Sequence, residues 1–368
     1  MSDAPDLVLA AGGTGGHIYP ALAVGKLAQA RGMRVAFIGQ AGGMEARLVP
    51  PSGIEFHGVS AGKWDRGRPR PGQAIAAAGG VVEAWTLVRR WRKTLRAVVG
   101  FGGFASFPGA FAATRCGVPL VLHEGNAYPS LVNRWLSARA ALVITVQEEA
   151  LGHLKGVKRS RVIPYPVEER KLDRAVARAH YGLPEDALVA LVMGGSQGSA
   201  ALNREVPAAY AKLLEAAGDD PTVERLHVLH SAGHANVESV KLQTTAQQIS
   251  LPRYHVHEYL DATIAWSVAD LGITRAGIGT LASAAYHGVP LVTVPLPSSA
   301  EGHQLHNARA AQAAGAATVV EESEFDKLPE AWLRLLQPEA LAAGKAAAQA
   351  RSPAGAAERI LEALMEVM

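Results

Sequence analysis

The segment "AAGGTGGHIYP", residues 10–20, places four glycines, a threonine and a histidine directly after a short apolar run. Glycines let a ligand approach the backbone, and the N–H groups at the start of a following helix attract anions such as phosphates. His17 ends this loop, and an imidazole beside an anion site is a candidate general base. The pattern therefore predicts a phosphate cradle with a proton acceptor at its edge, against the alternatives of a tight turn and a structural histidine.

The glycine spacing excludes two common nucleotide-binding motifs. Gly13, Gly15 and Gly16 do not form G-x-G-x-x-G, no G-x-x-x-x-G-K-[ST] occurs, and the second apolar run ends in Gly39 and Gln40 instead of an acidic residue. A second glycine loop, "GGSQG" at 194–198, again follows an apolar run and precedes a helical pattern. Two such loops favour a nucleotide-diphosphate donor and an acceptor.

The elements that position these loops repeat in the two halves of the chain. In each half an apolar run, a glycine loop, a helical pattern and another apolar run follow one another, and each half contains "GVPLV", starting at Gly117 and Gly288. This order predicts two Rossmann-like, doubly wound α/β domains with parallel sheets, facing across a cleft. We expect an N-terminal domain over 1–165, a C-terminal domain over 166–350, and a helix over 351–368 that packs back toward the N-terminal domain.

Composition limits the class of protein. The 368 residues are 49% hydrophobic and 19% charged, with a net charge of +3, which favours a globular protein and is too small to indicate nucleic acid. Cys116 is the single cysteine, so no internal disulfide forms and a reducing cytosol is expected. No secretory leader is recognised, and glycines and prolines interrupt the charge-free stretches 97–114 and 276–300, which argues against membrane spans.

One segment is typical of contact with a membrane surface. Residues 74–96, "AIAAAGGVVEAWTLVRRWRKTLR", combine apolar residues at helical spacing with a basic cluster, and "GKWDRGRPRPG" before them adds further basic residues. Such helices can lie in the interface of an anionic bilayer. The predicted contact residues are Ile75, Val82, Trp85, Arg89 and Arg90. The alternative is an ordinary helix that packs Trp85 and Val88 into its own domain.

Seven motifs in order carry a resemblance that covers nearly the whole chain: "GGTGGHIYP", "MEARLVP", "GFGGFASFPGAFAA", "HEGN", "GGSQG", "RAGIGTLASAAYHGVP" and "GHQLHNA". Together they resemble the MurG family, the peptidoglycan N-acetylglucosaminyltransferases of the GT-B class. The resemblance implies inverting transfer of GlcNAc from UDP-GlcNAc to the 4-hydroxyl of MurNAc in undecaprenyl-diphospho-MurNAc-pentapeptide (lipid I), which yields lipid II. It implies a peripheral enzyme on the cytoplasmic face of the membrane, in contact with anionic lipid and other cell-wall synthesis proteins, without cofactor or metal.

The same resemblance assigns roles to individual residues. His17 takes the proton of the acceptor hydroxyl, Ser196 binds the donor diphosphate, and Gln304 binds the GlcNAc hydroxyls. The residues that it implies for UDP-GlcNAc are Thr14, Gly15, Gly16, Asn126, Ser196, Leu260, Thr280, Leu281, Ser283 and Gln304.

The chain departs from the family at four positions: Ser283 replaces a glutamate that grips the ribose, Gly125 a glutamine, Tyr165 an asparagine and Glu168 an arginine. Because Glu168 reverses a charge near the implied diphosphate, either Arg170 or Lys171 replaces the missing cation, or the segment lies differently. Two other functions stay open: another GT-B transferase that joins a UDP-sugar to a lipid such as diacylglycerol, and a catalytically weak relative that binds nucleotide or lipid as a scaffold.

Overall fold

The computed structural model describes residues 4–61, 71–195, 198–247, 249, 253–299 and 302–368. The chain divides into unit 1, which runs to Glu168 and includes Pro353–Met368, and unit 2, Glu169–Ser352. The first boundary lies three residues beyond the expected one. The reason is local, because Val167 is buried and the Glu168 carboxylate lies 3.3 Å from Lys26 Nζ within unit 1.

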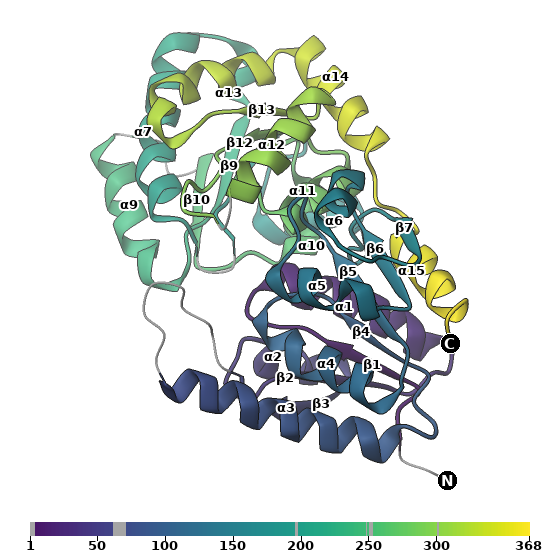
Figure 1. The fold of residues 1–368 in the computed structure, drawn as a ribbon. Helices are drawn as coiled ribbons and strands as arrows, with labels where there is room; N and C mark the ends of the chain where they lie inside the picture. The colour runs from purple at the N-terminus through teal and green to yellow at the C-terminus, as the bar shows by residue number, and fades with distance from the viewer. Residues whose placement is uncertain (1–3, 62–70, 196–197, 248, 250–252, 300–301) are drawn as a thin grey trace. The chain divides into compact units, whose positions relative to one another are not determined.

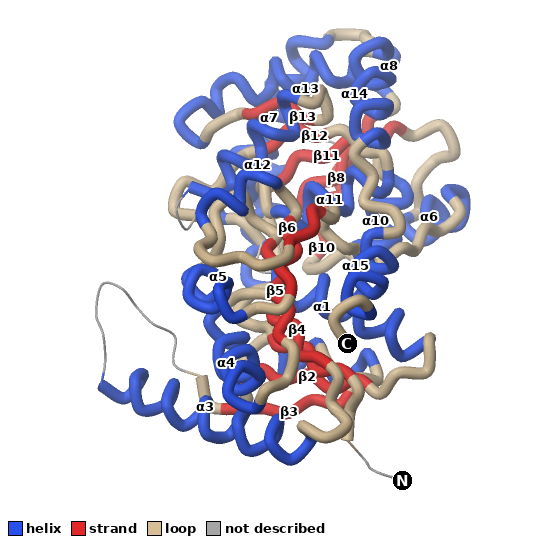
Figure 2. Tube along the Cα trace, turned by 45° about the vertical axis from the view of Figure 1, so that its right-hand side comes forward, coloured by secondary structure: helices blue, strands red, loops and turns tan. Residues whose placement is uncertain are grey.

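The strands of unit 1 pair in parallel in the order β3-β2-β1-β4-β5-β6-β7 (Figures 1 and 2). They are β1 (Leu7–Ala10), β2 (Val35–Gln40), β3 (Glu55–Val59), β4 (Ala97–Gly100), β5 (Leu120–Glu124), β6 (Leu142–Thr145) and β7 (Ser160–Val162). The central strands are short apolar runs buried on both faces, as a parallel sheet covered by helices requires. The prediction of a parallel, doubly wound sheet is confirmed for this half.

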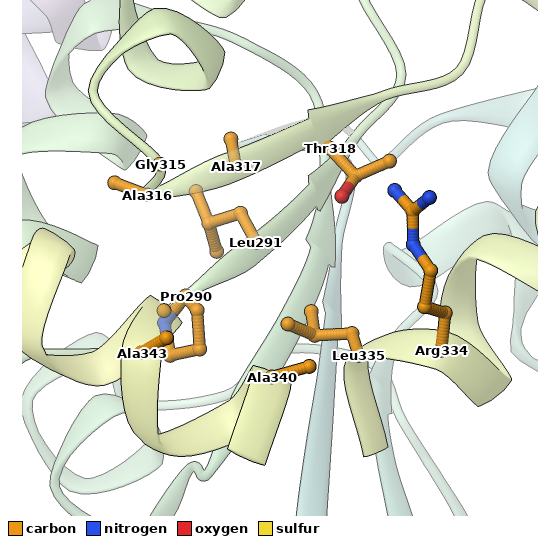
Figure 3. A pocket seen from close by; sticks show the side chains of 11 residues that line it. Pro290, Leu291, Gly315, Ala316, Ala317, Thr318, Arg334, Leu335, Ala340 and Ala343 are labelled. Carbon is orange, nitrogen blue, oxygen red and sulfur yellow. The ribbon is translucent and has the colours of Figure 1, made fainter. Parts of the chain in front are cut away.

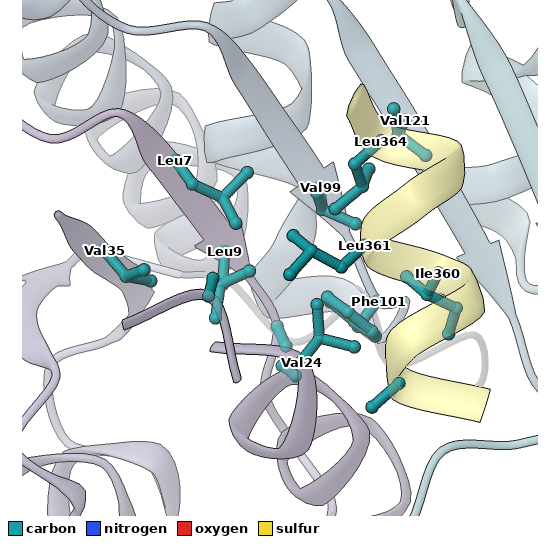
Figure 4. Packing of buried hydrophobic residues seen from close by; sticks show 14 of the residues in the cluster. Leu7, Leu9, Val24, Val35, Val99, Phe101, Val121, Ile360, Leu361 and Leu364 are labelled. Atoms are coloured by element: carbon teal, nitrogen blue, oxygen red, sulfur yellow. The ribbon is translucent and has the colours of Figure 1, made fainter. Parts of the chain in front are cut away.

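Two helical layers cover that sheet. The helices are α1 (Gly15–Ala30), α2 (Glu45–Leu48), α3 (Pro71–Trp91), α4 (Phe107–Cys116), α5 (Leu131–Leu136) and α15 (Ala356–Met365). Alternate side chains of β1 point to opposite layers. Leu7 and Leu9 pack with α1 and α15, whereas Val8 packs with α3 and α4. Figure 4 shows Leu361 and Leu364 of α15 pointing toward the sheet, so the C-terminal helix is part of the core of unit 1.

Unit 2 has a second parallel sheet in the order β10-β9-β8-β11-β12-β13. Its strands are β8 (Leu188–Met193), β9 (Leu226–Ser231), β10 (Tyr254–His257), β11 (Leu271–Thr274), β12 (Leu291–Thr293) and β13 (Ala317–Val319). Its helices are α6 (Arg174–Tyr181), α7 (Ala200–Ala217), α8 (Pro221–Glu224), α9 (Val237–Ala246), α10 (Ala262–Val268), α11 (Ile278–His287), α12 (His303–Ala313), α13 (Leu328–Leu336) and α14 (Pro338–Ala350). Val192 packs with α7 and α13, and its neighbour Leu191 with α10 and α11, so this sheet is also covered on both faces.

The repeated pentapeptide "GVPLV" has the same structural role in both units. Gly117 ends α4 with φ 70°, and Gly288 ends α11 with φ 74°. Both values lie in the left-handed region, where glycine stops a helix without the steric penalty of a Cβ. The next strand, β5 or β12, begins three residues later in each unit. The repeat therefore marks equivalent turns in two similar folds.

Candidate functional site

The first glycine loop, residues 11–17, connects β1 to α1 and holds His17 in the first turn of the helix. Thr14 is the N-cap residue, with extended backbone angles, but its hydroxyl makes no cap hydrogen bond. The Oγ1 atom instead lies 3.1 Å from His17 Nδ1. When Nδ1–H donates to this hydroxyl, Nε2 is the ring nitrogen that can accept a proton. That tautomer, with the proton on Nδ1, is the one suited to the expected general base.

A third glycine pair, in "GFGGFAS", packs against the imidazole. Gly102 and Gly103 have φ values of 90° and 75°, and a Cβ on Gly102 would lie 3.0 Å from His17 Cδ2. A Cβ on Gly103 would overlap the carbonyl oxygen of Gly12. These two glycines therefore allow the turn after β4 to lie directly against His17 and the first loop, a contact that no local sequence pattern indicates.

The carboxyl group of Glu45 lies beneath the first loop. Its side chain is completely buried and accepts hydrogen bonds from Gly13 N at 3.2 Å and Gln40 N at 2.8 Å. A Cβ at Gly12 or Gly43 would overlap the same carboxyl group. Part of the glycine requirement is therefore structural. The available sequence signal was a single acidic residue after two glycines in "GGMEARL".

Glu124 organises the "HEGN" motif at the carboxyl end of β5. Its buried carboxyl accepts from Asn126 N at 3.0 Å and from the Asn126 amide nitrogen at 3.1 Å. The other oxygen accepts from Ser130 N at 2.8 Å and Asn133 Nδ2 at 2.9 Å. Burial raises the pKa of Glu124, and these hydrogen bonds oppose the shift. Glu124 therefore fixes the orientation of Asn126, and Ser130 Oγ approaches within 3.9 Å of the Cβ position of Gly102 beside His17.

The two departures at 165 and 168 both contact α1. Tyr165 is buried and its hydroxyl donates to the carbonyl oxygen of Gly16 at 2.8 Å. Glu168 pairs with Lys26, and Lys171 Nζ lies 4.7 Å from the ring centre of Tyr286 within unit 2. The contacts of Tyr165 and Glu168 favour the second alternative, a segment that serves α1 instead of the diphosphate.

The second glycine loop, residues 194–199, connects β8 to α7. Ser196 lies outside the described residues, so its role stays a prediction. Gly195 and Gly198 have φ values of 97° and 74°. Ser199 caps α7, because its Oγ accepts from Leu202 N at 3.3 Å.

A buried guanidinium lies beneath this second loop. Arg275 is 7% exposed; its Nε donates to Ser199 Oγ at 3.0 Å and its Nη1 to the carbonyl of Val294 at 3.2 Å. Its Nη2 pairs with Glu322 Oε1 at 2.6 Å. Arg275 follows β11, and its three contacts reach the segments after β8, β12 and β13, so it fixes the carboxyl edge of the sheet, where ligands of doubly wound folds bind. Its sequence signal was a basic residue directly after a buried strand.

The other predicted donor residues lie in segments near that edge. Thr280 and Ser283 are half-buried in α11, whose N-cap, Gly277, has no side-chain hydrogen bond to the helix. Leu281 is 8% exposed and packs in the core, and its backbone N–H donates to the Gly277 carbonyl at 3.1 Å, so its contact with the nucleotide stays a prediction. Leu260 is half-buried and packs against the same core cluster.

Gln304 lies in the first turn of α12. Its Oε1 accepts from Leu296 N at 3.0 Å, in the segment after β12. With the oxygen fixed, the amide nitrogen is the group that can donate to a ligand oxygen.

Helix α3 divides the predicted membrane residues between surface and core. Val82 is 61% exposed and Arg89 and Arg90 are exposed, whereas Trp85 is half-buried with the Arg89 guanidinium 4.8 Å from its ring centre. Val88 lies in the core, as the alternative of an ordinary helix expected for it, because α3 packs against α4 and the sheet. The side chain of Ile75 and the whole segment 62–70 lie outside the described residues. Within the described parts of the chain, no helix has the length and apolar character to cross a membrane.

A cavity of about 160 Å³ lies elsewhere in unit 2, between β12, β13, α13 and α14 (Figure 3). Thr318 and Arg334 supply its polar side chains, and small apolar residues form most of the lining. The lining contains none of the predicted site residues. Over the described ranges, no three His, Cys, Asp or Glu side chains are grouped as ligands for a metal ion.

Comparison with known proteins identifies the family. Residues 7–145 match the glycosyltransferase family 28 N-terminal domain, and residues 189–360 match the family 28 C-terminal domain. A relative from Deinococcus radiodurans is 43% identical over 98% of this chain and 95% of its own length. One from Thermus thermophilus is 39% identical over 97% and 98%. Both are named UDP-N-acetylglucosamine–N-acetylmuramyl-(pentapeptide) pyrophosphoryl-undecaprenol N-acetylglucosamine transferase.

Solved structures agree with this result. MurG of Acinetobacter baumannii superimposes with a TM-score of 0.75 at 26% identity, covering 98% of this chain and 99% of the other. The calicheamicin glycosyltransferase CalG4 shares the fold, with a TM-score of 0.64 at 18% identity and full coverage of both chains. The chain therefore belongs to the MurG family of glycosyltransferases, built from two parallel-sheet α/β domains of the GT-B class.

Proposed function

We propose that this chain transfers GlcNAc from UDP-GlcNAc to the MurNAc 4-hydroxyl of lipid I, with inversion, and so forms lipid II. The observation that carries the proposal is the His17 imidazole, held at the start of α1 by Thr14 and enclosed by Gly102 and Gly103. The names of the relatives support the substrates, since they describe this transfer.

The proposed chemistry is a single displacement at the anomeric carbon of GlcNAc. The 4-hydroxyl oxygen attacks from the face opposite UDP, the new C–O bond forms, and the bond between the anomeric carbon and the UDP oxygen breaks with its electron pair leaving on UDP. His17 Nε2 takes the hydroxyl proton, while Thr14 stabilises the ring through Nδ1. Inversion by this route needs no covalent nucleophile.

In the proposal unit 2 binds the donor. The second glycine loop and the start of α11 supply backbone N–H groups to the diphosphate, and Arg275 holds the loops in place. The Gln304 amide nitrogen donates to a GlcNAc hydroxyl, and Leu260 contacts the uracil. Ser283, as a neutral hydroxyl in α11, makes one hydrogen bond to the ribose where a carboxylate would make two.

The acceptor is a membrane lipid, so we propose that the enzyme is peripheral, on the cytoplasmic face. Val82, Arg89 and Arg90 of α3 provide an exposed apolar residue beside cations. Each cation near an anionic leaflet contributes about 1 kcal/mol to binding. R89E/R90E/R92E is therefore expected to lose co-sedimentation with vesicles rich in phosphatidylglycerol, and R139E/K155E/K158E, which reverses three exposed cations of the same unit, is the matched control. Equal vesicle binding by the two variants would contradict this contact surface.

Incubation of the purified chain with labelled UDP-GlcNAc and either lipid I or diacylglycerol tests the function. We expect labelled lipid II from lipid I and no product from diacylglycerol. Product from diacylglycerol alone would favour the other transferase activity. UDP binding with no transfer to either lipid would favour the scaffold function.

A further inference from the structure

Helix α1 contains an internal proline that removes one of its backbone hydrogen bonds. Pro20 lies in the second turn of α1 and has no N–H. In an α-helix the N–H of residue 20 would donate to the carbonyl of residue 16. The Gly16 carbonyl oxygen therefore loses its normal helical partner, and the proline ring crowds the same carbonyl.

The Tyr165 hydroxyl supplies the missing donor. It lies 2.8 Å from the Gly16 oxygen, although the two residues are 149 positions apart. Tyr165 is 3% exposed, and burial raises the pKa of its phenol, so the hydroxyl stays protonated and donates. The segment is attached to α1 a second time through Glu168 and Lys26. Both ends of the segment 165–168 therefore contact α1, Tyr165 through Gly16 and Glu168 through Lys26.

The residue that follows Gly16 is His17, and both residues before the histidine are glycines. Consecutive glycines give the backbone conformational freedom that other residues lack. A hydrogen bond to the Gly16 carbonyl restrains the peptide that leads directly into His17. For a general base, a small displacement of the ring changes the rate strongly, because proton transfer requires hydrogen-bond distance to the substrate.

We propose that Tyr165 is a positioning residue for His17, acting through the Gly16 carbonyl that Pro20 leaves unpaired. This role rests on the proposed function, because it assumes that His17 takes the acceptor proton. It also explains the departure at position 165, since a buried phenol reaches the carbonyl and keeps its proton.

The test measures kcat and KM for Y165F with UDP-GlcNAc and lipid I. Loss of one neutral hydrogen bond that orients the base is expected to lower kcat about five- to tenfold, while KM for UDP-GlcNAc stays within about twofold. Y210F is the matched control, since Tyr210 is buried in unit 2 and its hydroxyl donates to the carbonyl of Leu226. Y210F should lower the free energy of unfolding but leave kcat at the wild-type value.

Rescue by P20A separates positioning from simple stabilisation. Alanine at position 20 restores the N–H that can donate to the Gly16 carbonyl. The kcat of P20A/Y165F should therefore be less than about twofold below that of P20A. An equal loss in both backgrounds, or a kcat for Y165F equal to wild type, would overturn the role of Tyr165. A wild-type chain that makes no lipid II would instead overturn the proposed function, so the two failures differ.

Discussion

The two glycine loops occupy equivalent positions, each between the first strand and first long helix of its sheet, but opposite charges lie beneath them. Under the loop of unit 1 the Glu45 carboxyl accepts from Gly13 N, so one loop N–H is already used by an anion. Under the loop of unit 2 the Arg275 guanidinium donates to Ser199. Arg275 is also paired with Glu322, so the contrast lies in the hydrogen bonds: a buried acceptor holds the first loop and a buried donor holds the second. The two loops are alike in glycine content but differ in the buried group that supports them.

The N-cap hydroxyls show the same division. In α7 the Ser199 hydroxyl accepts from the backbone N–H three residues later, which is an ordinary cap. In α1 the Thr14 hydroxyl contacts the side chain three residues later, which is His17. One hydroxyl stabilises a helix, and the other orients a candidate base. This difference supports assigning proton transfer to unit 1 and donor binding to unit 2.

The largest effect is expected from H17A, which removes the base from the first loop only. kcat should fall by about 10²- to 10⁴-fold, the usual contribution of a general base. H153A, at an exposed histidine of the same unit, is the control in the same lipid II assay. If H17A retained more than a tenth of wild-type kcat, the first loop would have no proton-transfer role.

E45Q tests whether the carboxyl group holds the first loop. The carboxyl accepts two backbone hydrogen bonds, and an amide nitrogen in place of one oxygen would face a donor with a donor. The free energy of unfolding should fall by about 1–3 kcal/mol, measured in urea. E362Q, at an exposed glutamate of α15, should change little. Equal stability of the two variants would mean that Glu45 does not support the loop.

Much of the fold could be predicted from local sequence. Strands such as "LVLA" and "AVVG" are short apolar runs that end at glycines, and the two "GVPLV" copies mark equivalent turns. Within the site, Thr14 and His17 are three residues apart on one helix start, so their contact follows from helical geometry.

The rest depends on long-range contacts that a local pattern does not contain. Glu45 and Arg275 look like ordinary surface charges until the fold brings glycines or loop hydroxyls against them. The Tyr165 hydroxyl donates to the Gly16 carbonyl although the two residues are 149 positions apart in the sequence. In α3 the apolar residues spread over more than one side, so the pattern did not distinguish the core residue Val88 from the exposed Val82.

Acid sensitivity should be similar in the two units, because each contains a buried histidine whose pKa burial lowers to about 3: His123 in unit 1 and His230 in unit 2. The folded state favours the neutral imidazole. The contribution of each histidine to the free energy of unfolding is therefore fully present above about pH 6.5, the ordinary histidine pKa, and is lost as pH falls toward 3. In that window each histidine should lower the free energy of unfolding by about 1.4 kcal/mol per pH unit.

Urea unfolding at intervals from pH 7 to pH 4.5 measures this slope. H230Q should reduce the slope of the free energy of unfolding against pH for unit 2. H306Q, which replaces an exposed histidine, should leave the slope unchanged. A slope that H230Q leaves unchanged would show that His230 is not the group responsible.

A smaller effect is expected from R275M, which removes the cation beneath the second loop. Loss of its hydrogen bonds to Ser199 and Val294 should loosen the donor loops and raise KM for UDP-GlcNAc about tenfold, corresponding to about 1.4 kcal/mol. R309M, which removes an exposed arginine paired with Glu321, is the control. An unchanged KM would show that the contrast between the two loops has no part in donor binding.

The most direct test of that contrast is calorimetric titration of UDP into H17A and R275M, with wild type as reference. If unit 1 performs proton transfer and unit 2 binds the donor, H17A binds UDP with wild-type affinity and R275M binds about tenfold more weakly. Weak binding by H17A together with wild-type affinity for R275M would contradict the account.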